Sequence, residues 1–202
     1  ITGVKQLHPA DIEVIPDRVE AGTFLMAGAA LGEVTVQDVV PKHLKAVLSK
    51  LEETGAKIEI KGDAVTVTKA ENLAPVDMTT AVFPGFPTDL QAQWVALMML
   101  ANGSSVVTDT VYHDRFSHVP ELNRLGANIH LENNVAIIRG VKKLLGASVM
   151  STDIRASASL INAGLMAEGQ TDLSRIYHID RGYENIEAKY RALGADISRI
   201  SE

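Results

Sequence analysis

Residues 83–93 read Phe-Pro-Gly-Phe-Pro-Thr-Asp-Leu-Gln-Ala-Gln, and an uncharged run from Trp94 to Ala101 follows them. Two prolines and a glycine so close together cannot continue a helix, so residues 82–87 are predicted to be extended or turning. Thr88 or Asp89 then offers a side-chain oxygen to the free N–H groups of a new helix. Because residues 90–101 carry no charge on any face, this helix is predicted to be surrounded by protein.

The start of this helix is a candidate binding site. The Asp89 carboxylate, several free N–H groups and the positive end of the helix dipole lie there together, beside a rigid Pro-Gly turn. Such an end suits a polar or anionic ligand. The simpler interpretation is that Asp89 only caps the helix, as aspartates commonly do.

A second pattern recurs three times along the chain. Gly55-Ala56-Lys57-Ile58, Gly126-Ala127-Asn128-Ile129 and Gly194-Ala195-Asp196-Ile197 each end an amphipathic helical pattern and begin a strand-like one. Glycine at each helix end suits a left-handed cap. We therefore predict a single lobe of three repeats, with these approximate bounds: 1–75, 76–147 and 148–202.

Each unit also contains a helix with almost no charge. These three helices are predicted over Val19–Leu31, Leu90–Ala101 and Ala156–Ala167, and their small side chains favour close mutual packing. Strands then lie outside them, which makes the fold class α/β with each unit in the order strand, inner helix, strand, outer helix, strand, strand. The predicted strands are Glu33–Val36, Lys57–Ile60, Ala64–Thr68, Ser104–Thr108, Asn128–Leu131, Val135–Arg139, Leu173–Ile176 and Ala195–Ile200.

Equivalent repeats should point the N-termini of their inner helices toward the same end. Asp17, Asp89 and Asp153 would then meet at one face, with Arg18 and Arg155 beside them. Carboxylates grouped with arginines suit anion binding and proton transfer. This grouping favours a functional role for the face over simple capping.

Two loops just before the outer helices add further arginines. Arg115 follows Asp114, and Arg181 follows Asp180, in corresponding places of the second and third units. A surface Asp-Arg pair of little energetic consequence is the alternative for each. Repeated placement near the candidate face favours phosphate or carboxylate binding.

Composition excludes several classes of protein. The formal charge of −6 gives no general attraction to nucleic acid or to an anionic membrane. The chain contains no cysteine, its histidines lack metal-ligand spacing, and dinucleotide and P-loop motifs are absent, so we expect neither a metal nor another cofactor. No signal peptide or apolar run of membrane-spanning length is present, which predicts a cytoplasmic protein. The first residue is isoleucine, and we expect a piece of a longer chain.

Five longer blocks carry a family resemblance: Pro16-Asp17-Arg18-Val19-Glu20-Ala21-Gly22-Thr23, Pro84-Gly85-Phe86-Pro87-Thr88-Asp89-Leu90-Gln91-Ala92-Gln93, Arg115-Phe116 with His118-Val119-Pro120-Glu121-Leu122, Thr152-Asp153-Ile154-Arg155-Ala156-Ser157-Ala158-Ser159-Leu160, and Tyr177-His178-Ile179-Asp180-Arg181-Gly182-Tyr183-Glu184. In this order they closely resemble the C-terminal half of the bacterial UDP-N-acetylglucosamine enolpyruvyl transferases, a family of the EPSP synthase superfamily. The resemblance covers essentially the whole chain.

The resemblance implies a fold and a reaction. The fold is one lobe of an inside-out α/β barrel of six units in two lobes. The reaction moves enolpyruvyl from phosphoenolpyruvate to the 3-hydroxyl of UDP-N-acetylglucosamine and releases phosphate, the first committed step of the peptidoglycan synthesis that supports cell shape and division. The other, N-terminal lobe, with its mobile loop and reactive cysteine, is absent here, so the chain alone is expected to be inactive.

The resemblance also implies the site residues. Asp89 matches the aspartate that contacts the sugar 3-hydroxyl, as base or as orienting group, and Arg181 is the second catalytic residue. Val111 matches a backbone contact to the nucleotide sugar, and Asp153 matches the partner that holds one arginine in place. The implied substrate-binding set is Asp89, Val111, Arg115, Asp153, Arg155 and Arg181.

The chain departs from the family pattern near Arg115. His113-Asp114 replaces the usual Glu-Asn, and Asp109 replaces the usual Glu two positions before Val111. The added Asp114 carboxylate is expected to weaken the local anion site at Arg115.

Two other interpretations stay open. The related synthase that uses shikimate 3-phosphate shares the fold and the phosphoenolpyruvate chemistry, although the Pro-Gly-Phe-Pro-Thr-Asp block fits the sugar enzyme better. The third interpretation is a non-catalytic module that binds a nucleotide sugar or a partner lobe. Under any of the three interpretations, the exposed inner face is expected to favour self-association of the isolated lobe.

Overall fold

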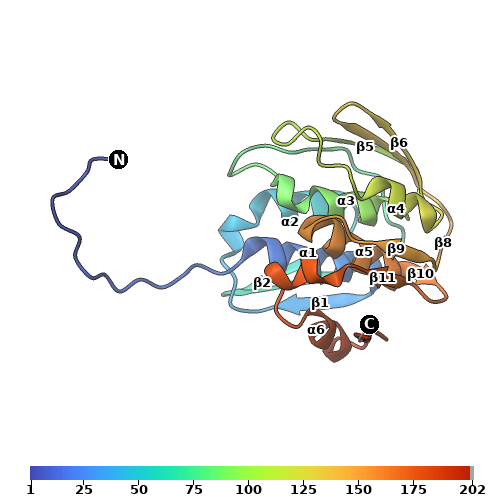
Figure 1. Ribbon diagram of the computed structural model, residues 1–202. Helices are drawn as coiled ribbons and strands as arrows, with labels where there is room; N and C mark the ends of the chain where they lie inside the picture. The colour runs from blue at the N-terminus through green and yellow to red at the C-terminus, as the bar shows by residue number, and fades with distance from the viewer. Residues whose placement is uncertain (201–202) are drawn as a thin grey trace.

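Three nearly uncharged helices form the centre of the fold. In the computed structural model, which describes residues 1–200, they are α1 (Arg18–Leu31), α3 (Gln91–Met98) and α5 (Ile154–Met166). Every residue of α3 is buried, and the three helices pack against one another in the middle of the molecule (Figure 1). The predicted inner helices are confirmed, although α3 ends three residues before the predicted Ala101.

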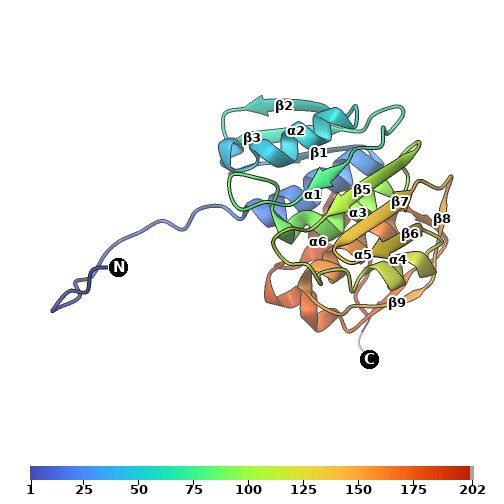
Figure 2. The same cartoon turned by 90° about the horizontal axis from the view of Figure 1, so that it is seen from above.

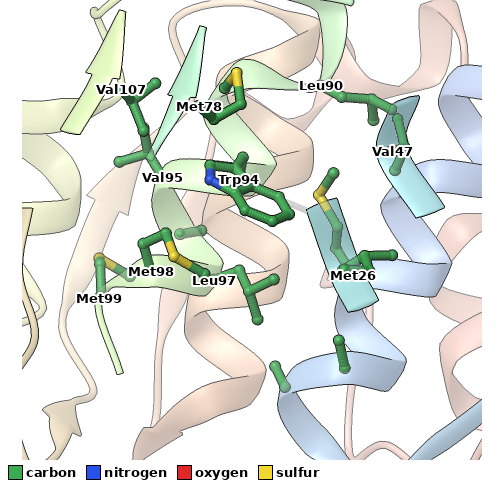
Figure 3. Packing of buried hydrophobic residues seen from close by; sticks show 14 of the residues in the cluster. Met26, Val47, Met78, Leu90, Trp94, Val95, Leu97, Met98, Met99 and Val107 are labelled. Atoms are coloured by element: carbon green, nitrogen blue, oxygen red, sulfur yellow. The ribbon is translucent and has the colours of Figure 1, made fainter. Parts of the chain in front are cut away.

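Aromatic packing fixes the turn that precedes α3. Trp94 is fully buried in the same cluster as Met26 of α1 (Figure 3). The Phe86 ring meets Trp94 edge-on, with ring centroids 5.5 Å apart. Gly85 is needed next to Phe86, because a Cβ there would lie 2.6 Å from the Cβ of Ala81. The turn is therefore held on α3 immediately before the candidate site.

Short strands lie outside the inner helices. Their bounds are β1 Glu33–Val36, β2 Lys57–Lys61, β3 Ala64–Thr68, β4 Met78–Thr79, β5 Ser104–Thr108, β6 Asn128–Glu132, β7 Val135–Arg139, β8 Leu144–Leu145, β9 Ser148–Met150, β10 Ala167–Glu168 and β11 Asp172–Ser174. The largest sheet has the order β4-β5-β7-β6, with β4 parallel to β5 and the other pairs antiparallel. A second, antiparallel sheet has the order β1-β3-β2, and the parallel pairs β8-β10 and β9-β11 complete the set. Figure 2 shows the two larger sheets on different sides of the inner helices.

Three outer helices are short and half-exposed. They are α2 (Lys45–Glu53), α4 (Val119–Arg124) and α6 (Ile186–Ala192). The predicted left-handed glycines follow them, with φ of 90° at Gly55, 92° at Gly126 and 95° at Gly194. The 3₁₀ segments are η1 Pro41–His43, η2 Thr88–Leu90 and η3 Ile176–Arg181. None of the helices within residues 1–200 has both the length and the apolar character needed to cross a membrane.

The predicted order of elements is complete only in the middle unit. No strand precedes α1 within residues 1–17. These residues are extended and exposed, but within residues 1–200 they pair with no other strand. The strand predicted over Ala195–Ile200 is wrong, and the one predicted over Leu173–Ile176 ends at Ser174, where the chain turns into η3. A β-prone segment becomes a strand only where a neighbour pairs with it, and the described part of the chain offers none at these places. The bounds of the three units remain a prediction.

Candidate functional site

One aspartate lies between two arginines from different units. Asp89 Oδ1 lies 2.9 Å from Arg115 Nη1 and 3.1 Å from Arg155 Nε. Arg115 comes from the loop before α4, and Arg155 from the first turn of α5. The three side chains are between 18% and 35% exposed, so water and ligands reach the cluster while the surrounding protein restricts its geometry. This arrangement joins an anion-binding pair to a carboxylate that can hold or accept a proton.

The predicted capping role of Asp89 or Thr88 is wrong. At the N-termini of η2 and α3, no backbone N–H group donates a hydrogen bond to a capping side chain within residues 1–200. Thr88 instead donates from Oγ1 to Asp109 Oδ2 at 2.6 Å, and Asp89 faces the two arginines. A guanidinium is a stronger partner for a carboxylate than a neutral backbone N–H, and two guanidinium groups lie within reach.

Two other aspartates do cap their helices. Asp17 accepts hydrogen bonds from the backbone N–H groups of Val19 and Glu20, and Asp153 accepts them from Arg155 at 2.8 Å and Ala156 at 3.0 Å. Burial would raise the pKa of Asp153, but the N–H of Ala156 and the Ser117 hydroxyl, among other partners, hold it below its ordinary value. Asp153 therefore stays ionised at neutral pH and fixes the backbone from which Arg155 reaches Asp89.

The expected meeting of three aspartates is found in part. Arg155 joins Asp89 to Asp153, since its side chain contacts the first and its backbone N–H contacts the second. Within residues 1–200, Asp17 has no hydrogen bond or ion pair with either of them. Arg18 lies over the Phe83 ring at 4.9 Å from its centroid and does not join the cluster.

The loop from residue 109 to residue 115 forms one wall of the site. Val111 is 43% exposed and donates its backbone N–H to Asp109 Oδ1. A cavity of about 310 Å³ is lined by Val111, Tyr112, His113 and Asp114. Arg115 links this cavity to the Asp89 cluster, since its guanidinium lies 5.3 Å from the centroid of the Tyr112 ring.

Arg181 has no hydrogen bond or ion pair with Asp89, Arg115 or Arg155 within the described residues. It ends η3, is exposed, and forms no ion pair within the described residues, whereas its neighbour Asp180 is bound in bidentate fashion by Arg199. The segment itself is anchored close by, because the buried Tyr183 hydroxyl lies 2.8 Å from Thr23 Oγ1 and accepts a hydrogen bond from Gln93. An exposed guanidinium on an anchored segment suits a contact that forms when an anion binds.

Sequence reasoning missed the buried polar residues behind the site. Asp109, Tyr183 and Gln93 are almost completely buried. Asp109 accepts hydrogen bonds from Thr80 and Thr88, while Tyr183 and Gln93 bond to each other and to Thr23 of α1. The only sequence signal at Asp109 was a departure from a family pattern. For Tyr183 and Gln93, the signal is a polar residue among apolar neighbours in the sequence, because a buried polar group needs a hydrogen-bond partner.

His118 is a further buried group beside the site, and it predicts a pH effect on stability. Burial lowers the pKa of its imidazole to about 4. The positive charge of Arg115 lowers this pKa as well, and the negative charge of Asp153 opposes both effects. The unfolded chain binds a proton at this histidine below about pH 6.5, whereas the folded chain does not until about pH 4. Stability is therefore expected to fall by about 2 kcal/mol between pH 7 and pH 5 through this residue.

Urea unfolding of the 202-residue chain at the two pH values measures this loss. His118→Gln removes the titrating group and is expected to flatten the difference between pH 7 and pH 5. The lowered pKa of Asp153 and Asp109 confines their own contributions to lower pH. An equal pH dependence in the wild-type chain and in His118→Gln would show that another group is responsible.

Comparison with known proteins adds sequence relatives. The family model described as EPSP synthase (3-phosphoshikimate 1-carboxyvinyltransferase) matches residues 1–190. A UDP-N-acetylglucosamine 1-carboxyvinyltransferase from Chlorobium chlorochromatii is 54% identical over 200 residues, which are 98% of this chain and 47% of the relative. The protein of the same name from Bdellovibrio bacteriovorus is 55% identical over 202 residues, 99% of this chain and 49% of the relative. The chain thus spans about half the length of the curated relatives it matches.

Solved structures agree on the fold. The enolpyruvyl transferase NikO from Streptomyces tendae superposes with a TM-score of 0.84 at 29% identity, over 93% of this chain and 45% of that one. EPSP synthase from Acinetobacter baumannii gives a TM-score of 0.70 at 20% identity, over 94% of this chain and 45% of that one, and supports the fold alone. The expected fold class, an α/β lobe like those of enolpyruvyl transferases, is confirmed.

Proposed function

The chain belongs to the EPSP synthase family, and from this membership we propose that it forms one lobe of an enzyme that transfers enolpyruvyl from phosphoenolpyruvate to the 3-hydroxyl of UDP-N-acetylglucosamine. Phosphate is the second product. Relatives that are 49–55% identical carry the name of the sugar enzyme, which favours UDP-N-acetylglucosamine over shikimate 3-phosphate as the acceptor. As part of such an enzyme the chain would serve peptidoglycan synthesis in the cytoplasm.

The observation that carries this proposal is the pairing of Asp89 with Arg115 and Arg155. Attack of the sugar oxygen on C2 of phosphoenolpyruvate requires the hydroxyl to lose its proton, and Asp89 is the carboxylate placed to accept it. The two arginines neutralise the carboxylate and phosphate of the donor as the tetrahedral intermediate forms and then loses phosphate. The acid that protonates C3 of the donor belongs to the other lobe, in line with the absence of cysteine from this chain. Its conjugate base takes a C3 proton back as phosphate leaves, which restores the double bond of the enolpyruvyl group.

The remaining residues have supporting roles in this proposal. Arg181 moves onto the donor phosphate when it binds and acts as the second catalytic residue. Val111 contacts the nucleotide sugar through its backbone, at the wall of the cavity formed by its loop. Asp153 holds the start of α5 and with it Arg155.

Phosphate release tests the proposal directly. We expect release that depends on both substrates when the chain is mixed with the separately produced N-terminal lobe, or when the full-length protein is used, and none from the chain alone. No phosphate release from the mixture, the full-length protein or the chain alone, each shown to be folded by circular dichroism, would contradict the proposal. Binding of UDP-N-acetylglucosamine without turnover in the mixture would favour a non-catalytic module instead.

A further inference from the structure

A fully buried carboxylate lies behind the Asp89 cluster. Asp109 has no exposed surface, and its two oxygens accept four hydrogen bonds from neutral donors. Burial pushes its pKa upward, but these hydrogen bonds outweigh burial and hold the pKa below its ordinary value. The donors are Thr80 Oγ1 at 2.7 Å, Thr88 Oγ1 at 2.6 Å, Val111 N at 3.0 Å and Tyr112 N at 2.9 Å. The side chain therefore lies in the structure as a carboxylate at neutral pH.

The donors belong to the two segments that present the site. Thr88 directly precedes Asp89, while Val111 and Tyr112 begin the loop that carries Arg115. The backbone of Asp109 is itself fixed, because its N–H donates to the Asn134 carbonyl and its carbonyl accepts from Asn134 Nδ2. One buried carboxylate thus ties η2, which carries Asp89, to the loop that carries Arg115.

The hydrogen bonds also have a defined direction. A threonine hydroxyl has a single proton, and that of Thr88 is donated to Asp109. Its lone pairs then face Arg115, whose Nη1 lies 3.4 Å away and also contacts Asp89. Asp109 accordingly orients Thr88, and Thr88 supports the guanidinium that binds Asp89.

We propose that Asp109 is a positioning residue that sets the distance and orientation between Asp89 and Arg115 for the reaction. It touches neither of them and acts through Thr88 and through the backbone of residues 111 and 112. This inference rests on the proposed function. Asparagine at this position would keep the size of the side chain but replace one acceptor oxygen by an NH₂ donor, which would face the hydroxyl of Thr80 or Thr88.

Steady-state kinetics of the full-length protein, with phosphate release as the readout, test the inference. Asp109→Asn is expected to lower kcat/KM for phosphoenolpyruvate about tenfold, since a lost hydrogen bond to a charged group has effects of this size. Asp109→Glu keeps the carboxylate and is expected to lie closer to wild type. Asp77→Asn is the matched control, because Asp77 also accepts a backbone N–H in the same sheet, from Val106 at 2.7 Å, but lies outside the network. It is expected to leave kcat/KM within about twofold of wild type, the ordinary range for a peripheral contact.

A double-mutant cycle separates positioning from general stability. Thr88→Val removes the intermediate hydroxyl, so Asp109→Asn and Thr88→Val together should lower kcat/KM little more than either alone. Hydrogen exchange of the peptide covering residues 110–115 is expected to accelerate in Asp109→Asn and not in Asp77→Asn. These outcomes support the inference.

Other results would overturn it. Multiplicative effects of the two substitutions, equal losses in the Asn and Glu variants, or unchanged exchange in residues 110–115 would each show that Asp109 does not act through Thr88 and the loop. An inactive wild-type protein is a separate outcome, because it would contradict the proposed function itself and not the role of Asp109.

Discussion

Replacing Asp89 by alanine in the full-length protein is expected to lower kcat for phosphate release about 1,000-fold, the scale of a lost general base. KM for phosphoenolpyruvate is not expected to rise. Arg115 and Arg155 lose the carboxylate they share, and both become available to the anionic donor. The fold should persist, because the three side chains are partly exposed and ion pairs of this kind contribute little to stability. The combination of lost kcat with unchanged or lower KM is the signature of a catalytic group.

Asp89→Asn separates the two roles that remain open for this residue. Asparagine can orient the sugar hydroxyl by accepting a hydrogen bond, but it cannot take the proton. A loss as large as that of Asp89→Ala identifies a base, and a much smaller loss identifies an orienting group. Asp172→Ala is the control, since Asp172 is exposed and bound to the nearby side chain of Gln170. Turnover near wild type in both Asp89 variants would remove this residue from the mechanism.

Replacing Arg155 by alanine is expected to raise KM for phosphoenolpyruvate about 100-fold, as the loss of a charge-assisted hydrogen bond to an anion predicts. Its side chain is 18% exposed, and its Nε lies 3.1 Å from Asp89 Oδ1. Its backbone N–H, in the first turn of α5, donates to Asp153. KM for UDP-N-acetylglucosamine should change far less, because the charge of Arg155 is proposed to face the donor.

Arg155→Lys tests whether shape or charge matters. Lysine keeps the charge but loses the planar fork that binds a carboxylate or phosphate through two N–H groups, so only part of the loss should be recovered. Arg124→Ala is the control, because Arg124 is a surface arginine whose Nε donates to the Ser148 carbonyl. Equal increases in KM for both substrates would contradict the assignment of Arg155 to the donor.

Several parts of the fold were predictable because local chemistry decides them. A helix without charge must be buried, so the runs that became α1, α3 and α5 were found from composition alone. Asp17 and Asp153 directly precede helices, and each caps its helix through Oδ1, although their grouping in the sequence favoured a functional role over simple capping. Strands with a partner in the same unit were also found, whereas Ala195–Ile200 was not a strand because pairing depends on a neighbour.

The sequence alone determined which helices lie inside, where glycines end the outer helices, and which charged residues stand near helix starts. Tertiary structure decided what those charges do. Asp89 had the same local signal as Asp17 and Asp153, yet it binds Arg115 and Arg155, which lie 26 and 66 positions away along the chain. A cap forms within one turn and can be read from neighbouring residues. An ion pair depends on which distant side chains the packing of α3 against α5 brings within about 3 Å, and only the folded chain sets that distance.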